Sequence, residues 1–171
     1  MTGELTTSFR EFKRKEEFAN KVAFAAYLNS LRSPALVGYF RPHHDDLIKH
    51  LKKLKPEARF QILAHDDQSL QTEELNLDRA IIPFVLSKLD MEQKREVLLR
   101  IHKALKPEAF IAIADYVSTH ASNLPTLHEL SELMHETNFT PFLYTRYNSL
   151  IEGQARVNLV HPVVIVTGHK P

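Results

Sequence analysis

The spacing of apolar side chains along the chain predicts helices that alternate with strands. Apolar residues recur every three or four positions, as on one face of a helix, in residues 8–31, 43–54, 91–105 and 126–136. Short continuous apolar runs, typical of buried strands, occupy residues 35–40, 60–65, 77–86, 110–117, 139–147 and 161–167. This alternation favours an α/β fold built on a mostly parallel sheet.

Residues at the ends of these segments sharpen the prediction. Asp90 and Gln93 have the spacing of a capping box, which opens a helix. The pair Lys106-Pro107 stops that helix, because proline neither donates a backbone hydrogen bond nor fits inside a helical turn. Pro83 interrupts or ends its strand for a related reason.

The last two predicted strands have no helix between them. The connection over residues 148–160 is too short for a helical crossover, so we expect these strands to be antiparallel neighbours. No repeat or linker divides the chain. We therefore expect a single domain over residues 1–171, with an N-terminal helical segment over residues 8–31.

Composition and charge narrow the function classes. The chain has 171 residues, with 22 Lys and Arg against 21 Asp and Glu and a net charge of +1, so charge gives no case for binding nucleic acid. There is no cysteine, which excludes disulfides and a cysteine nucleophile. No segment reads as a signal peptide or a membrane span, so we expect a cytoplasmic protein without membrane contact.

The second half of the chain resembles the class I methyltransferases, which depend on S-adenosylmethionine (SAM). Those proteins show a strand, a leucine-striped helix, a Leu-Lys-Pro-Gly-Gly turn and a buried strand, followed by a further helix and two strands. The resemblance covers residues 77–171, and the matching stretches are Leu86–Asp90, Val97–Pro107, Phe110–Asp115, Leu130–Phe142 and Val163–Pro171. It implies a Rossmann-like, mostly parallel sheet with an antiparallel C-terminal strand pair, helices on both faces and a reduced N-terminal half.

The chain departs from this family where the cofactor is held. The family's cofactor loop carries closely spaced glycines, which let the backbone approach the methionine part of SAM. This chain has four glycines in all, at positions 3, 38, 153 and 168, and no two of them can form that loop. The turn after Leu105-Lys106-Pro107 holds Glu108-Ala109 in place of two glycines. SAM binding is therefore possible but doubtful.

Polar residues follow several predicted strands, at the edge where parallel sheets bind ligands. The resemblance implies that Asp66 or Asp67 receives the ribose hydroxyls of SAM, although aspartates also cap turns and this simpler role is favoured. If the protein is an enzyme, His43, His44 or His120 is a candidate general base for a hydroxyl acceptor.

Three further features admit a functional and a structural interpretation, and the structural one is favoured each time. Histidines and carboxylates after the strands could bind a divalent metal, but no two have a recognised metal spacing, so no metal ligand is assigned. The lysines of residues 49–55 fit a solvated helix face better than a membrane or partner helix. Phe142, Tyr144 and Tyr147 could line an acceptor pocket, but such residues more often form sheet core and edge.

Three functions remain open from the sequence. The first is a methyltransferase-like pseudoenzyme that has lost normal SAM binding and acts as an interaction or regulatory module, with a protein partner or as a homodimer. The second is a compact, active SAM-dependent methyltransferase on a small-molecule acceptor. The third is a His/Asp metal or small-ligand binder. Core positions of the resemblance are intact while its cofactor loop is missing, and this asymmetry favours the first function.

Overall fold

The protein is built around one sheet of mixed strand direction. The computed structural model describes residues 16–28, 35–41, 46–67, 75–118, 124–152 and 155–171. Within these ranges six strands follow the order β2-β1-β3-β4-β6-β5. Their bounds are β1 (Leu36–Tyr39), β2 (Arg59–Ile62), β3 (Leu77–Pro83), β4 (Leu105–Tyr116), β5 (Thr140–Glu152) and β6 (Ala155–His169). Strands β1 to β4 are parallel, whereas β6 is antiparallel to both β4 and β5. The α/β prediction and the antiparallel terminal pair are confirmed.

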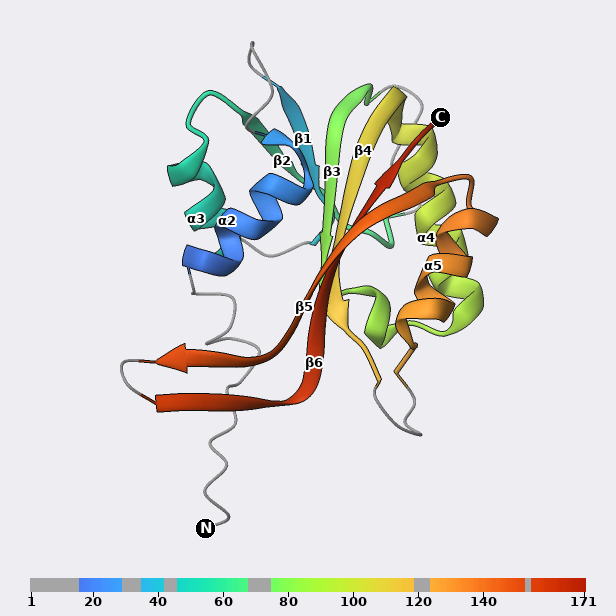
Figure 1. Ribbon diagram of the computed structural model, residues 1–171. Coiled ribbons are helices and arrows are strands. Elements are labelled where there is room, and N and C mark those ends of the chain that lie inside the picture. Colours follow the sequence, from blue (N-terminus) through green and yellow to red (C-terminus); the bar gives the residue numbers. More distant parts are fainter. Residues whose placement is uncertain (1–15, 29–34, 42–45, 68–74, 119–123, 153–154) are drawn as a thin grey trace.

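Helices cover both faces of the sheet, as Figure 1 shows. One face packs against α2 (Glu16–Ala25) and α3 (Asp46–Leu54), and the other against α4 (Met91–Ala104) and α5 (Leu127–Glu136). A short 3-10 helix, η3 (Leu86–Lys88), joins β3 to α4. Because β3 and β4 are covered on both sides, the segments 80–83 and 109–114 are apolar at every position, and these runs predicted the strands from the sequence.

The start of α4 confirms the predicted capping box. The backbone N–H of Gln93 donates to the Asp90 carboxylate at 2.8 Å, and the backbone N–H of Asp90 donates to the Gln93 side chain at 3.1 Å. The helix also ends as predicted, at Ala104, just before Lys106-Pro107, whereas β4 begins at Leu105, earlier than the predicted start at residue 110. These local signals fix the chain direction into β4.

Two further boundaries differ from the prediction. Of the predicted helix 8–31, residues 8–15 and 29–31 lie outside the described residues. The described α-helix covers Glu16–Ala25 and ends earlier than predicted, because Tyr27 adopts a left-handed φ of 57° in the turn at residues 26–28. Residues 148–160 are not a loop, because β5 and β6 continue through most of them as a paired arm that projects from the body in Figure 1. The antiparallel pairing itself is as expected.

No helix in the described ranges has the length and apolar character needed to cross a membrane.

Candidate functional site

The topology of the sheet points to one place for a ligand. From β1 the chain moves outward to β2 and then crosses back to β3 on the other side of β1. This reversal makes the carboxyl ends of β1 and β3 the topological switch point, where open α/β sheets bind ligands. The residues that follow these two strands therefore decide what the fold can hold.

An arginine spans the switch point. Arg41, two residues beyond the end of β1, is buried, and its Nη1 donates to the backbone carbonyl of Pro83, the last residue of β3, at 3.3 Å. The two residues before it, Tyr39 and Phe40, are also buried. Arg41 thus bridges the ends of the two strands.

The end of β3 adds an aromatic cluster. Phe84 is buried in a left-handed conformation, with φ at 55°, and its N–H donates to the carbonyl of Ala114. Its ring lies 5.8 Å from that of Phe18 in α2 and 5.1 Å from that of Tyr116 at the end of β4. A large aromatic residue in this conformation persists only where its surroundings hold it. Helix α2 supplies part of that support through Phe18.

Gly38 serves packing inside this region. A Cβ added at Gly38 would lie 2.5 Å from Leu77 Cδ1 and 2.8 Å from Phe40 Cε2. The space that the missing side chain leaves in β1 is therefore taken up by neighbouring side chains. A glycine that admits a ligand would instead face open space.

A buried carboxylate lies at the end of β4. Asp115 accepts from the backbone N–H of Ser87 at 3.0 Å and from that of Tyr116 at 2.8 Å. Burial raises the pKa of this carboxyl, and the hydrogen bonds and the buried Lys94 oppose the shift. Burial, and then the charge of Asp115, raise the pKa of Tyr116 to about 12. Asp115 anchors η3 to β4 and is fully enclosed, so it holds structure together rather than facing a substrate.

The predicted aspartates lie beside a small cavity after β2. The cavity has a volume of about 110 Å³, and its lining includes His65, Asp66 and Arg100. Arg100 Nη1 donates to the carbonyl of His65 at 2.8 Å, and Nη2 donates to that of Asp67. The Nδ1 atom of His65 is buried with no hydrogen-bond partner, and burial lowers the pKa of the imidazole.

The aspartates themselves are exposed in the turn that α4 holds. Asp66 lines the cavity with its side chain, whereas the contact made by Asp67 to Arg100 is through its backbone carbonyl. Ligand pockets for molecules of drug size usually measure about 300–1,000 Å³. A cavity of this volume takes a small group rather than a whole nucleoside.

The structure does not describe the histidines singled out from the sequence. His43, His44 and His120 fall outside the described residues, so their role as a general base stays a prediction. Within the described ranges no group of three histidine or acidic side chains is placed to hold a metal ion. Lys49, Lys52 and Lys53 are exposed on α3, as a solvated helix face requires.

The aromatic residues of β5 divide between two environments. Tyr147 is half-buried, with its ring 6.0 Å from that of Phe18. Phe142 and Tyr144 are largely exposed and line a second cavity, of about 350 Å³, between β5 and α5. This cavity is at the edge strand and is not formed by the carboxyl ends of β1 and β3.

Sequence reasoning missed the side chains that fill the switch point. The sequence pattern does not single out Arg41, and Phe84 lies inside the apolar run over residues 77–86. Arg41 meets its partner 42 residues further along the chain, and no local pattern reveals such a contact. The one available signal was the lack of small residues after β1, where Tyr39, Phe40 and Arg41 are all bulky.

Comparison with solved structures identifies the fold. The chain matches a 1,6-didemethyltoxoflavin-N1-methyltransferase of Burkholderia thailandensis, solved with S-adenosylhomocysteine, with a TM-score of 0.64 and 19% identity over 94% of this chain and 81% of that one. It matches the [4+2]-cyclase SpnF with a TM-score of 0.65 and 10% identity, over 91% and 80% of the two chains. A SAM-dependent methyltransferase of Methanosarcina mazei gives a TM-score of 0.58 and 10% identity, over 84% and 96%.

No protein-family model and no curated protein matches the sequence. The structural matches nevertheless extend over most of the chain, so the protein has a class I methyltransferase-like fold. This confirms the resemblance that the sequence carried over residues 77–171 and extends it over most of the chain. The cyclase among the matches illustrates that this fold also serves other reactions.

Proposed function

We propose that this protein is a methyltransferase-like domain that has given up ordinary SAM binding and serves as an interaction module. The observation that carries the proposal is the filled switch point, where Arg41 donates to the carbonyl of Pro83 across the ends of β1 and β3. A cofactor at this place would need the strand ends that Tyr39, Phe40 and Arg41 now cover.

The residues present do not fit SAM. Gly38 has no open space in front of it, because Leu77 and Phe40 already occupy the position of a side chain. Asp66 could still accept ribose hydroxyls, but it borders a cavity of only about 110 Å³. We therefore derive no methyl-transfer step for this chain.

Calorimetry with SAM and with S-adenosylhomocysteine tests the proposal directly. We expect no saturable heat at ligand concentrations up to millimolar, and no rise in melting temperature, because a ligand that binds only the folded state must raise it. A methyltransferase with a known SAM site serves as the positive control for ligand quality. Saturable binding of micromolar strength would overturn the proposal.

A matched pair of variants shows where any binding occurs. If SAM binds and Asp66 accepts its ribose hydroxyls, Asp66→Ala lowers the affinity for SAM. The control Glu57→Ala, in the exposed turn before β2, leaves that affinity unchanged. Loss of affinity in Asp66→Ala alone would favour the second function, a compact active methyltransferase on a small-molecule acceptor. The similarity to a structure solved with S-adenosylhomocysteine is the observation that favours this alternative.

A further inference from the structure

Strand β5 forms an edge of the sheet and exposes apolar side chains there. In the described sheet β5 pairs with β6 alone. Phe142, Leu143 and Tyr144 are exposed by 48%, 36% and 59%, at three consecutive positions. The other large exposed apolar side chains of the described ranges, Phe24, Met91 and Leu99, lie on helices. An edge strand with this surface pairs readily with another strand, and proteins normally protect such edges with charge.

A groove accompanies this edge on the face that carries α5. Its cavity of about 350 Å³ is lined on one wall by Leu127, Ser131 and His135 of α5 and on the other by residues 141–144 of β5. The three helix residues are spaced by four, so this wall is about 12 Å long. An extended strand of about four residues has the same length. The groove therefore matches a short strand laid along β5.

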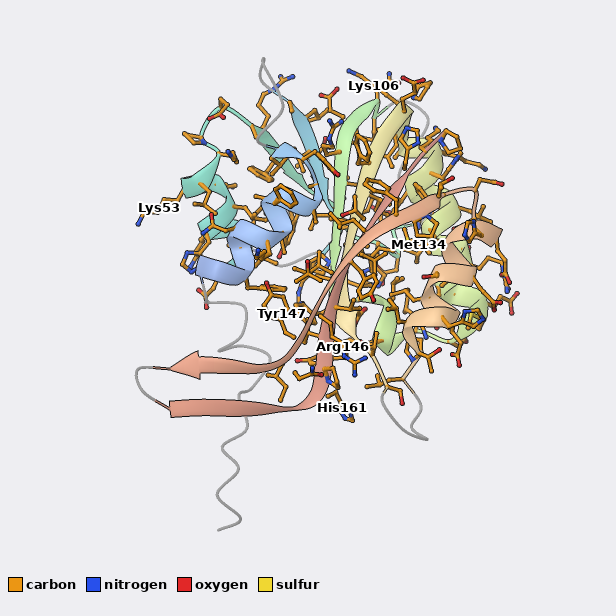
Figure 2. All side chains as sticks on the ribbon, viewed as in Figure 1. Lys53, Lys106, Met134, Arg146, Tyr147 and His161 are labelled. Carbon is orange, nitrogen blue, oxygen red and sulfur yellow. The ribbon has the colours of Figure 1, made fainter. Side chains whose placement is uncertain are left out.

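The charges beside the groove are complementary to each other. Glu132 is exposed on α5, next to the groove residue Ser131, and forms an ion pair with His128 at 3.1 Å. Arg146 is exposed on β5, two residues beyond Tyr144, and Figure 2 shows it on the opposite side of the strand from Tyr147. Tyr147 contacts Phe18 of α2, and Arg146 is paired in register with Val164, which packs in the α4–α5 core. Arg146 therefore projects on the side of α5.

We propose that this edge binds a second copy of the chain, with the β5 strands of the two copies paired antiparallel about a twofold axis near Tyr144. The partner strand carries what the groove requires, namely an apolar segment followed by a basic residue. Because α5 runs antiparallel to β5, pairing centred on Tyr144 brings Arg146 of one copy toward the C-terminal half of α5 in the other, where Glu132 lies. The surface is self-complementary, as a twofold interface must be.

The paired segment has natural limits. Pro141 lacks a backbone donor, so pairing centred on Tyr144 extends over residues 142–146. The net charge of +1 offers little repulsion between two copies. Pairing would cover Tyr144 and close the groove from its open side. The dimer proposal rests on the proposed function, because it assumes that the role of the domain is contact between chains and not catalysis.

Sedimentation velocity with the full chain, from low micromolar to about 100 μM, tests the proposal. We expect a species of twice the 19.7 kDa chain mass. Tyr144→Lys places a charge at the centre of the interface and should weaken dimerisation by about tenfold or more. The matched control Leu99→Lys introduces the same charge at an exposed apolar position of α4 and should leave the dimer intact.

A charge exchange tests the orientation of the two copies. Arg146→Glu should weaken the dimer by roughly fivefold, and adding Glu132→Arg should restore it, because the ion pair is then reversed. A chain that stays monomeric over the whole concentration range would overturn the proposal. So would a dimer that ignores Tyr144→Lys, or one that Leu99→Lys disrupts equally.

The two proposals fail separately. Calorimetry on the same preparation tests SAM binding, and a dimer that binds SAM would overturn the proposed function while leaving the interface in place. A monomer that ignores SAM would overturn the dimer alone. Circular dichroism of each variant confirms that a change of mass comes from the interface and not from unfolding.

Discussion

Substitution of Gly38 by alanine separates two explanations for this glycine. If Gly38 were present to admit a ligand, a methyl group there would leave the free protein unaffected. The structure instead places Leu77 Cδ1 and Phe40 Cε2 at 2.5 and 2.8 Å from the position of a Cβ. Both distances are shorter than any ordinary contact between carbon atoms, so these neighbours must move.

The expected penalty follows from packing alone. The φ of Gly38 is not in the left-handed region, so alanine introduces no backbone strain. An extra methyl group in a packed core costs about 1–3 kcal/mol, and the reduced freedom of the unfolded chain returns about 0.4–1 kcal/mol. Gly38→Ala should therefore lower the free energy of unfolding by about 0–2.6 kcal/mol, with a midpoint of about 1.3 kcal/mol.

Urea denaturation followed by far-UV circular dichroism measures this change, since the chain has no tryptophan to report by fluorescence. In a protein of this size each kcal/mol lowers the melting temperature by about 2–4 °C. Leu77→Val removes the nearest carbon, so the double variant should lose less stability than the two single losses added together. A raised stability in Gly38→Ala would refute the packing explanation.

Two further predictions concern backbone strain and pH. Glu108 adopts a left-handed φ of 65° at the turn between α4 and the buried part of β4. Glu108→Gly should therefore raise the free energy of unfolding by about 0.5–1 kcal/mol in the same urea assay. A decrease in the free energy of unfolding would contradict this explanation. Burial raises the pKa of Asp115 in the folded protein. Above the ordinary aspartate range, the folded state therefore still holds a proton that the unfolded state releases. The contribution of this group to stability is lost as pH rises above that range. Melting temperatures measured against pH should therefore decline less steeply in Asp115→Asn than in wild type, and parallel profiles would contradict the burial effect.

Much of the fold was predictable because its signals are local. The strands β3 and β4 are apolar on both faces, and the Asp90–Gln93 capping box opens α4 at the expected residue. The length of β5 and β6 was not predictable, because the arm over residues 148–160 mixes polar and apolar side chains without a clear alternation. A register shift between Tyr147 and Ser149 further breaks the period of two.

For the candidate site, the positions of polar residues after the strands were predictable from the sequence, but their burial and their contacts were not. The sequence placed polar residues at the carboxyl edge, and the structure puts Asp66 in a turn there and Asp115 at the end of β4. It could not show that Asp115 is enclosed or that Arg41 reaches the end of β3, because both depend on segments that meet only in the folded chain. The four glycines remained the one clue from composition.

The contacts made by Arg41 and Phe84 at the strand ends also contribute to the stability of the fold. A ligand at the strand ends would contribute hydrogen bonds and apolar contacts to the folded state. Here Arg41 supplies a hydrogen bond to the carbonyl of Pro83, and the rings of Phe84, Phe18 and Tyr116 supply the contacts. Because these groups belong to the chain, their contribution does not depend on ligand concentration. These contacts therefore stabilise the domain whether or not a ligand is present, and contact with another molecule at the exposed edge strand β5 would add to that stability.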